Sequence, residues 1–267
     1  MKKLGKIYLV LVMLFLYVPI FVLIVFSFNE SKSRSVFSGF TLDWYRKLFQ
    51  NDIIISSLVN TLIIAVIASI VSTVLGTLAA IGINSMKKVP KAIVMNITNM
   101  PIINPEIVTG VSLMLLFVFF AARMNLEFGF VTLLIAHITF NIPFDVPYVI
   151  LNVMPKFRQM DPHLYEAAQD LGCSPFKAFI KVVLPEIMPG VVSGFLMAFT
   201  YSLDDFVISY FTSGSSSQTL PVTIYSMTRR KVSPEINALS TIIFVVVVVI
   251  LIVKNFIEIR QLKKKGA

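Results

Sequence analysis

Acidic side chains inside long apolar segments are the residues of this sequence best suited to chemistry. Four of them occur there: Glu106, Asp145, Asp204 and Asp205. An ionised side chain is costly to bury in a lipid bilayer, so each is expected to face a cavity, a partner helix or water. Their chemistry would be the binding of a cation that passes through the protein. For each of the four, the alternative is a place nearer the membrane surface or a hydrogen bond to a kinked backbone.

The adjacent residues Asp204 and Asp205 are expected to have different roles. Consecutive helical residues point about 100° apart, so the two carboxylates cannot both face the centre of one cavity. One is expected to meet a cation, and the other to cap or pair with a neighbouring helix. The nearby rings of Tyr201 and Tyr210 offer cation–π contacts, with aromatic packing as the alternative. His137 is expected to be a hydrogen-bonded core residue.

The sequence lacks the motifs of an enzyme. It contains neither a G-x-S-x-G nucleophile motif nor the G-x-x-x-x-G-K-[ST] loop that holds phosphates. Its two histidines and single cysteine lack the spacing of zinc ligands. An intramembrane aspartyl protease would need a second aspartate motif on another helix. We therefore expect no catalysis, metal or cofactor in this chain, so that any ATP and Mg²⁺ are bound by a partner ATPase.

The composition is that of an integral membrane protein. Of the 267 residues, 57% are hydrophobic and only 14% are charged, and the mean hydropathy is +0.85. The net charge of +9 does not indicate nucleic-acid binding, because the basic residues lie in short loops and at both ends. The apolar run near the N-terminus has no small-x-small cleavage site after it, so it is expected to remain as a membrane span.

Six segments are long and apolar enough to cross a bilayer, which needs roughly 18 or more residues. They are residues 7–28, 58–83, about 101–122, 128–153, 187–212 and 236–253. Prolines predict that the third span is kinked or begins late, and that the fourth is distorted. With six crossings both termini lie on one side, and most of the 23 Lys and Arg residues place that side in the cytoplasm.

A polar stretch between the fourth and fifth spans, residues 161–185, predicts a cytoplasmic helical hairpin. Asp161 and Pro162 predict the start of one short helix, and Gly172 its end. Ser174 then predicts the start of a second short helix that ends at Pro185. Each helix has an apolar face and a charged face. Such a hairpin is typical of a docking element rather than a catalytic one.

The hairpin carries a recognisable motif. The stretch E-A-A-Q-D-L-G from Glu166 to Gly172, followed by V-V-L-P from Val182 to Pro185, resembles the EAA motif of binding-protein-dependent ABC importer permeases. Val182 stands where that motif usually has isoleucine. Further stretches, among them H-I-T-F-N-I-P-F and S-L-D-D-F-V-I-S-Y-F, resemble the permease subunits of spermidine/putrescine ABC transporters.

The resemblance implies an all-α membrane protein with six transmembrane helices, the type I ABC importer architecture, and one permease domain over residues 1–267. It implies a heterodimer with a second homologous permease, two copies of a cytoplasmic ABC ATPase, and an extracytoplasmic polyamine-binding protein in the bacterial inner membrane. The residues expected to couple to the ATPase are Glu166, Ala167, Ala168, Asp170, Gly172, Leu184 and Pro185. Those expected along the substrate pathway are Glu106, Tyr201, Asp204, Asp205 and Tyr210. Asp145 departs from the family pattern, in which an apolar residue is expected, so the resemblance assigns it no role.

Two alternatives stay open. The docking motif does not specify the cargo, so the chain could be an ABC importer permease for another small solute. It could also be an ion-coupled secondary transporter or channel that uses the membrane acids. Secondary transporters often show inverted repeats and need no docking hairpin, and no internal repeat is visible in this sequence.

Overall fold

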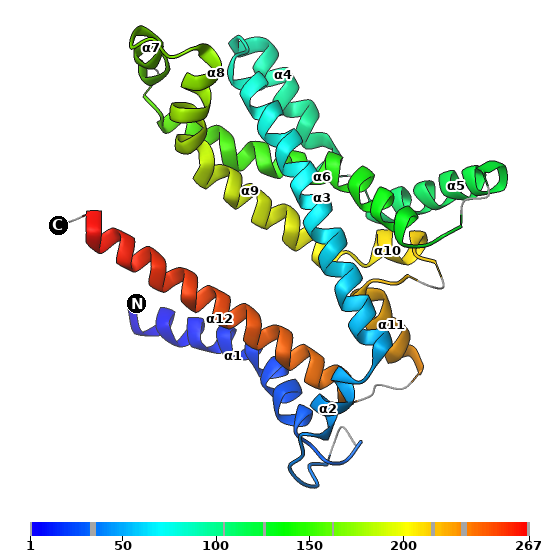
Figure 1. Cartoon of the computed structure of the whole chain (residues 1–267). Coiled ribbons are helices and arrows are strands. Elements are labelled where there is room, and N and C mark those ends of the chain that lie inside the picture. Colours follow the sequence, from blue (N-terminus) through cyan, green and yellow to red (C-terminus); the bar gives the residue numbers. More distant parts are fainter. Residues whose placement is uncertain are drawn as a thin grey trace. The chain divides into compact units, whose positions relative to one another are not determined.

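A computed structural model describes residues 2–32, 36–103, 105–124, 127–161, 163–214, 217–230 and 234–265 (Figure 1). These residues form helices, and apart from one isolated bridge between Asn29 and Phe40 they form no β-structure. The all-α prediction is therefore confirmed for this part of the chain. Pro162, predicted to open the hairpin, lies outside the described residues. The helices are α1 Lys2–Ser27, α2 Asp43–Phe49, α3 Asp52–Asn84, α4 Lys88–Asn99, α5 Glu106–Met124, α6 Phe130–Gln159, α7 His163–Asp170, α8 Pro175–Ala178, α9 Leu184–Asp204, α10 Val207–Thr212, α11 Leu220–Arg230 and α12 Pro234–Lys265.

Four helical segments of the described chain are long and apolar enough to span a membrane. They are Gly5–Ser27, Asp52–Asn84, Glu106–Arg123 and Pro175–Asp204. Helix α6 adds a fifth if its two halves, Phe130–Phe140 and Ile142–Gln159, form one span. Pro234–Val249 in α12 is apolar over a shorter length. The count of six spans therefore stays a prediction.

The prolines act where the sequence indicated. The two halves of α6 meet at 47° just before Pro143, because a proline ring clashes with the carbonyl of the preceding turn. The distortion predicted for the fourth span is thus confirmed. In the third span, a 3₁₀ turn occupies Met100–Ile103 and the α-helix begins only at Glu106.

The predicted fifth span differs at both ends. The prediction that the second hairpin helix ends at Pro185 is wrong, because helical structure runs from α8 through a π-turn at Phe179–Val183 directly into α9. The wider π-turn, placed just before Pro185, accommodates a residue that has no N–H to donate. The prediction of one continuous span over residues 187–212 is also wrong. Helix α9 ends at Asp204, Asp205 is extended (φ −63°, ψ 115°), and α10 begins at Val207.

The chain forms two compact units, Met1–Ile55 with Ile224–Ala267, and Ser56–Thr223. In the first unit α1 and α12 lie side by side, and α2 packs on α12 (Figure 1). Trp44 of α2 is buried, and its indole N–H donates to the Asn29 carbonyl at 2.7 Å. The single domain expected from the sequence stays a prediction.

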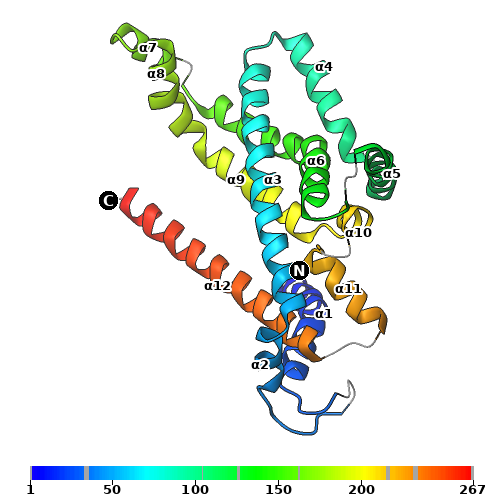
Figure 2. The ribbon, with the colours of Figure 1, turned by 45° about the vertical axis from the view of Figure 1, so that its right-hand side comes forward.

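The second unit is built on α6 and α9, which pack along each other (Figure 2). Two glycines of α9 permit the close approach. A Cβ at Gly190 would lie 2.6 Å from the Asn152 carbonyl oxygen, and one at Gly194 would lie 3.0 Å from Val149 Cα. Small residues at a helix interface let the backbones approach in this way.

Helix α3 contributes polar contacts to the same unit. The Thr61 hydroxyl donates to the Ser57 carbonyl at 2.8 Å and accepts the Leu220 N–H at 2.7 Å. Ser57 and Thr223 share a hydrogen bond of 2.7 Å between their hydroxyls. These bonds attach the start of α11 to α3.

Replacing Gly190 by alanine is expected to destabilise the protein. The new Cβ would meet backbone atoms of α6, which cannot move as a flexible side chain can, and overpacking of this kind typically costs about 1–3 kcal/mol. Thermal unfolding in detergent, followed by size-exclusion chromatography, would measure the effect. The matched control is Gly82→Ala in α3, where a Cβ meets no atom within 4 Å. Equal unfolding midpoints for the two variants would show that α6 and α9 are not packed this tightly.

Candidate functional site

A cavity of about 530 Å³ lies within the second unit. Its size falls in the range of small-molecule sites. Of the described residues that line it, four are acidic and none is basic. The lining residues are Glu106 from α5; Phe140, Phe144, Asp145 and Tyr148 from α6; Met197, Thr200, Tyr201 and Asp204 from α9; Asp205 and Phe206 from the break; and Val207 from α10.

Four of the five residues expected along a substrate pathway line this cavity. Asp204 is exposed, and its side chain has no hydrogen-bond or ion-pair partner within the described residues. Glu106, the first residue of α5, is also exposed. Tyr201 lies on α9 one turn before Asp204. The fifth residue, Tyr210, does not line the cavity, and its ring packs against those of Phe206 and Phe211 at 5.4 and 5.5 Å.

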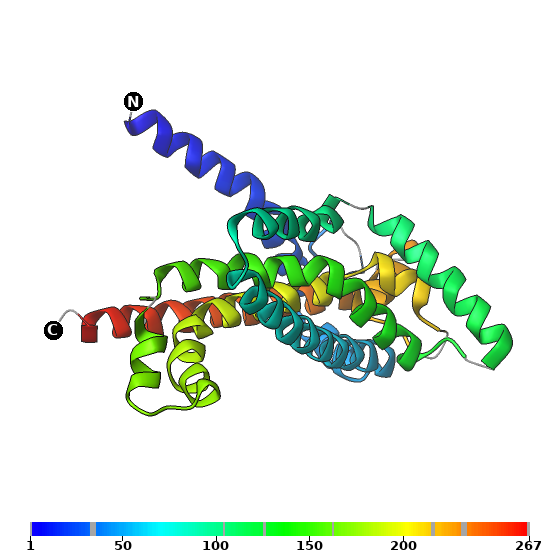
Figure 3. The same ribbon diagram turned by 90° about the horizontal axis from the view of Figure 1, so that it is seen from above.

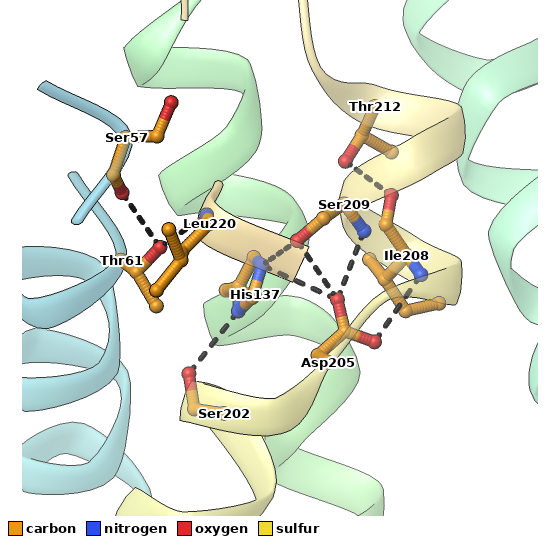
Figure 4. Close-up of polar contacts among 9 residues, drawn as sticks. All are labelled: Ser57, Thr61, His137, Ser202, Asp205, Ile208, Ser209, Thr212 and Leu220. Carbon is orange, nitrogen blue, oxygen red and sulfur yellow. Dashed lines mark hydrogen bonds and ion pairs between the residues drawn. The ribbon is translucent and has the colours of Figure 1, made fainter. Parts of the chain in front are cut away.

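Asp205, in contrast to Asp204, is held by hydrogen bonds (Figure 4). Its carboxylate accepts the backbone N–H groups of Ile208 at 3.2 Å and Ser209 at 2.9 Å, and the Ser209 hydroxyl at 3.0 Å. Its side chain is only 6% exposed. The first N–H groups of a helix have no partner within the helix, so a carboxylate placed here stabilises the start of α10.

His137 of α6 completes this network (Figure 4). The buried ring lies between two hydroxyls, with Nδ1 3.1 Å from Ser202 Oγ and Nε2 2.9 Å from Ser209 Oγ. Nε2 also lies 3.4 Å from an oxygen of Asp205. Because Ser209 donates to Asp205, the contacts are satisfied when Nε2–H donates to Ser209 and Ser202 donates to Nδ1. His137 thereby connects α6 to both sides of the break, and the prediction of a hydrogen-bonded core histidine is confirmed.

Aromatic side chains form much of the remaining wall. Tyr148 and Tyr201 stack with ring centroids 5.0 Å apart, and the Tyr201 hydroxyl donates to that of Tyr148 at 3.3 Å. Phe140 and Phe144 stack at 4.3 Å. Sequence reasoning missed Tyr148, Phe140 and Phe144. Their spacing around Asp145 on one helix was the available signal, but the partner on α9 was not visible in the sequence.

The hairpin of α7 and α8 is a second candidate site, at the end of the α6–α9 pair away from α10 (Figure 3). The Asp161 carboxylate accepts the His163 N–H at 2.9 Å, as expected of a helix cap. Ser174 occupies the predicted position before α8, but its side chain makes no capping hydrogen bond. That part of the prediction is wrong for the side chain, although the Ser174 backbone is extended (φ −64°, ψ 154°), as at a helix start.

Gly172 terminates α7 in a left-handed conformation, with φ +85°. The Gly172 N–H donates to the Gln169 carbonyl at 2.8 Å, and the Cys173 N–H donates to that of Ala168 at 3.1 Å. This pair of bonds is the Schellman motif, which favours glycine at this position. A Cβ at Gly172 would meet no atom within 4 Å, so the backbone conformation alone demands glycine.

The residues expected to couple to an ATPase divide between two faces of the hairpin. Ala168 is buried and Leu184 half-buried, so both pack within the protein. The Glu166 side chain is 74% exposed and lies 3.6 Å from the His163 ring. The other members of the set are exposed: Ala167, Asp170, Gly172 and Pro185. Of the two adjacent alanines, only Ala167 therefore lies on the surface of the hairpin.

The two helices that wall the cavity also lead into the hairpin. Helix α6 ends at Gln159 just before it, and α9 continues from it to Asp204 at the cavity. The 21 residues of α9 span about 30 Å at 1.5 Å per residue. A displacement of the hairpin can thus reach the cavity through two packed helices. Among the described residues no cluster of His, Cys, Asp and Glu could hold a metal ion.

Comparison with known proteins places this geometry in a family. The family model described as "Binding-protein-dependent transport system inner membrane component" matches residues 72–260. The chain is 37% identical to the spermidine/putrescine transport system permease protein PotC of Shigella flexneri over 252 residues, 94% of this chain and 92% of that protein. It is 40% identical to the putrescine transport system permease protein PotI of Escherichia coli K12 over 233 residues, 86% of this chain and 81% of that protein.

The fold is also that of a known transporter. A chain in the crystal structure of a bacterial ABC transporter involved in the import of the acidic polysaccharide alginate superposes with a TM-score of 0.70. The superposition covers 97% of this chain and 98% of that one at 18% sequence identity. From its sequence and its fold, this chain belongs to the family of binding-protein-dependent transport system inner membrane components, and it is a transporter permease rather than an enzyme.

Proposed function

We propose that this chain is a permease subunit of an ATP-driven importer for polyamines such as spermidine and putrescine, and that the cavity is part of the translocation route. The observation that carries the proposal is the set of four carboxylates, with no basic side chain, among the described residues that line the cavity. Polyamines are cationic along their length at neutral pH, so they require acids along their path. The polyamine transport named for the relatives supports the same cargo.

Within the cavity, Asp204 and Glu106 are the residues that bind ammonium groups, since both are exposed there. The Tyr201 ring lies beside Asp204 on α9 and offers its face to a cation. Asp205 shapes the site instead, because both of its carboxylate oxygens accept hydrogen bonds from the start of α10. No ligand role follows for Tyr210, which lies outside the cavity lining.

The hairpin is the element through which ATP hydrolysis drives transport. A short exposed helix with two acids, Glu166 and Asp170, and a small residue, Ala167, suits a groove of a partner protein. That partner is a cytoplasmic ABC ATPase in two copies, which binds ATP and Mg²⁺. Rigid-body motion of the docked hairpin would be transmitted along α6 and α9 to the cavity. The hairpin and both termini are cytoplasmic in this proposal, in keeping with their lysines and arginines.

Two further partners complete the proposed complex, a second homologous permease and an extracytoplasmic polyamine-binding protein. A related solved complex, described as a bacterial alginate ABC transporter in complex with an alginate pentasaccharide-bound periplasmic protein, supports the second of these. Membrane lipid surrounds the apolar helices, and the proposal involves no nucleic acid. A permease for another small cationic solute is the remaining alternative, because it would use the same carboxylates.

The test is reconstitution of the complete complex in proteoliposomes. The chain is co-expressed with the candidate ATPase, second permease and binding protein, and ATP hydrolysis and uptake of labelled putrescine and spermidine are measured. Both activities are expected to rise with polyamine and to vanish without the binding protein. If a basic amino acid stimulates ATP hydrolysis and polyamines do not, the transported solute is not a polyamine. Complete insensitivity of ATP hydrolysis to the permease would contradict the coupling.

A further inference from the structure

Asp145 is the one acid of the cavity to which the proposed function assigns no role. It lies on α6, is only 1% exposed, and lines the cavity. Its Oδ2 atom is buried and has no hydrogen-bond partner among the described residues. The other buried acid, Asp205, has partners for both of its oxygens. Asp145 therefore has a carboxylate oxygen that accepts no hydrogen bond from the described part of the protein.

An unpaired buried carboxylate is costly, and a counter-charge is the usual remedy. The neighbouring cavity residues on α6 are aromatic: Phe140, Phe144 and Tyr148. None of the described residues that line the cavity is basic, so the described part of the chain supplies no cation at this place. A ligand that enters the cavity with a positive charge would supply it.

The position of Asp145 relative to Asp204 decides what kind of cation fits. The two acids come from different helices, α6 and α9, which the stacked pair of Tyr148 and Tyr201 joins at the cavity wall. Phe144 and Met197, one from each of these helices, also line the cavity. Two carboxylates at separate points of an apolar cavity match a ligand with two ammonium groups joined by methylenes.

We infer that Asp145 is a second ammonium-binding site, which holds one end of a di- or polyamine while the other end lies at Asp204. The inference rests on the proposed function, because it assigns a further contact within the same cavity. A cation with a single ammonium group needs only Asp204. Asp145 thus makes the cavity select for the number of charges on the ligand.

The experiment compares ligands with one and two ammonium groups on the detergent-solubilised permease complex. Affinities for putrescine and for n-butylamine are measured by ligand-dependent thermal stabilisation, for the native chain and for Asp145→Asn. The substitution keeps the shape of the side chain and removes its charge. Putrescine affinity is expected to fall about tenfold or more, as for loss of one partner of a buried ion pair, while butylamine affinity stays unchanged. Asp204→Asn should weaken both ligands.

Stability without ligand distinguishes binding from a structural role. Since Asp145→Asn removes an unpaired buried charge, the ligand-free variant should unfold at the same temperature as the native complex or above it. The control is Asp52→Asn, the same change at an exposed acid in the first turn of α3, which should alter neither affinity.

The outcomes separate this inference from the proposed function. Unchanged putrescine affinity in Asp145→Asn would overturn the second site and leave polyamine transport standing. Equal losses for both amines would overturn the two-ended arrangement, and a large loss of ligand-free stability would assign Asp145 a structural role. If the native complex binds no diamine at all, the proposed function itself fails.

Discussion

Gly172→Asp is expected to abolish transport and to weaken association with the ATPase, while the protein remains inserted in the membrane. The left-handed φ of +85° costs about 1–2 kcal/mol for most residues with a Cβ and less for aspartate or asparagine, so the main effect comes from the new carboxylate, two residues from Asp170. The space around Gly172 is open, so the damage is limited to the turn and to the charge of the docking surface. The change in the turn and the added negative charge both fall on the segment proposed to bind the ATPase.

Two other substitutions separate the backbone effect from the charge effect. Asparagine has nearly the same size as aspartate, tolerates the left-handed conformation and carries no charge, so Gly172→Asn should retain most of the activity. Gly172→Ala adds backbone strain without charge and should lie between them. Co-purification of the ATPase and polyamine uptake in proteoliposomes are the measurements. If Gly172→Asp retains native co-purification and uptake, the hairpin is not the coupling element.

Asp204 and Asp205 are expected to fail in different ways when each is replaced by asparagine. Asp204→Asn should lower polyamine uptake about tenfold or more, because an ammonium group loses its charged partner, while the stability of the complex stays unchanged. Asp205→Asn should lower stability by about 1.5–3 kcal/mol, the worth of a hydrogen bond to a charged group. Uptake would then fall because the break between α9 and α10 no longer holds Asp204 in place.

Thermal unfolding and uptake kinetics, measured on both variants, test this division. Ser209→Ala provides a comparison for Asp205, since it removes one hydrogen bond from the carboxylate and one from the His137 ring and leaves the cavity acids in place. It should resemble a mild form of Asp205→Asn, with a small loss of stability. Lower stability in Asp204→Asn, or native stability in Asp205→Asn, would reverse the assigned roles.

Local sequence patterns predicted those elements that depend on a few neighbouring residues of the chain. The left-handed glycine at the end of α7, the Asp161 cap and the distortion of α6 near its prolines follow from backbone constraints on a few adjacent residues. The apolar runs predicted an all-helical membrane protein for the same reason. The predictions that failed also concerned local signals. Pro185 was expected to end a helix, but the π-turn before it lets the helix continue.

The functional cavity depends on contacts that no local pattern describes. From the sequence, four acids in apolar segments indicated cation transport, and helical geometry indicated that Asp204 and Asp205 would differ. The tertiary structure decided which of the two is held, because the His137 ring reaches Ser202, Ser209 and Asp205 only after α6 packs against α9. The same packing gives Asp145 a place in the cavity wall, where its Oδ2 atom has no hydrogen-bond partner among the described residues. Sequence alone thus determined the helical membrane class, the EAA motif and the presence of the acids, since these depend on residue type and spacing along one chain. The separate environments of those acids were decided by tertiary structure, because each depends on side chains brought together from different helices.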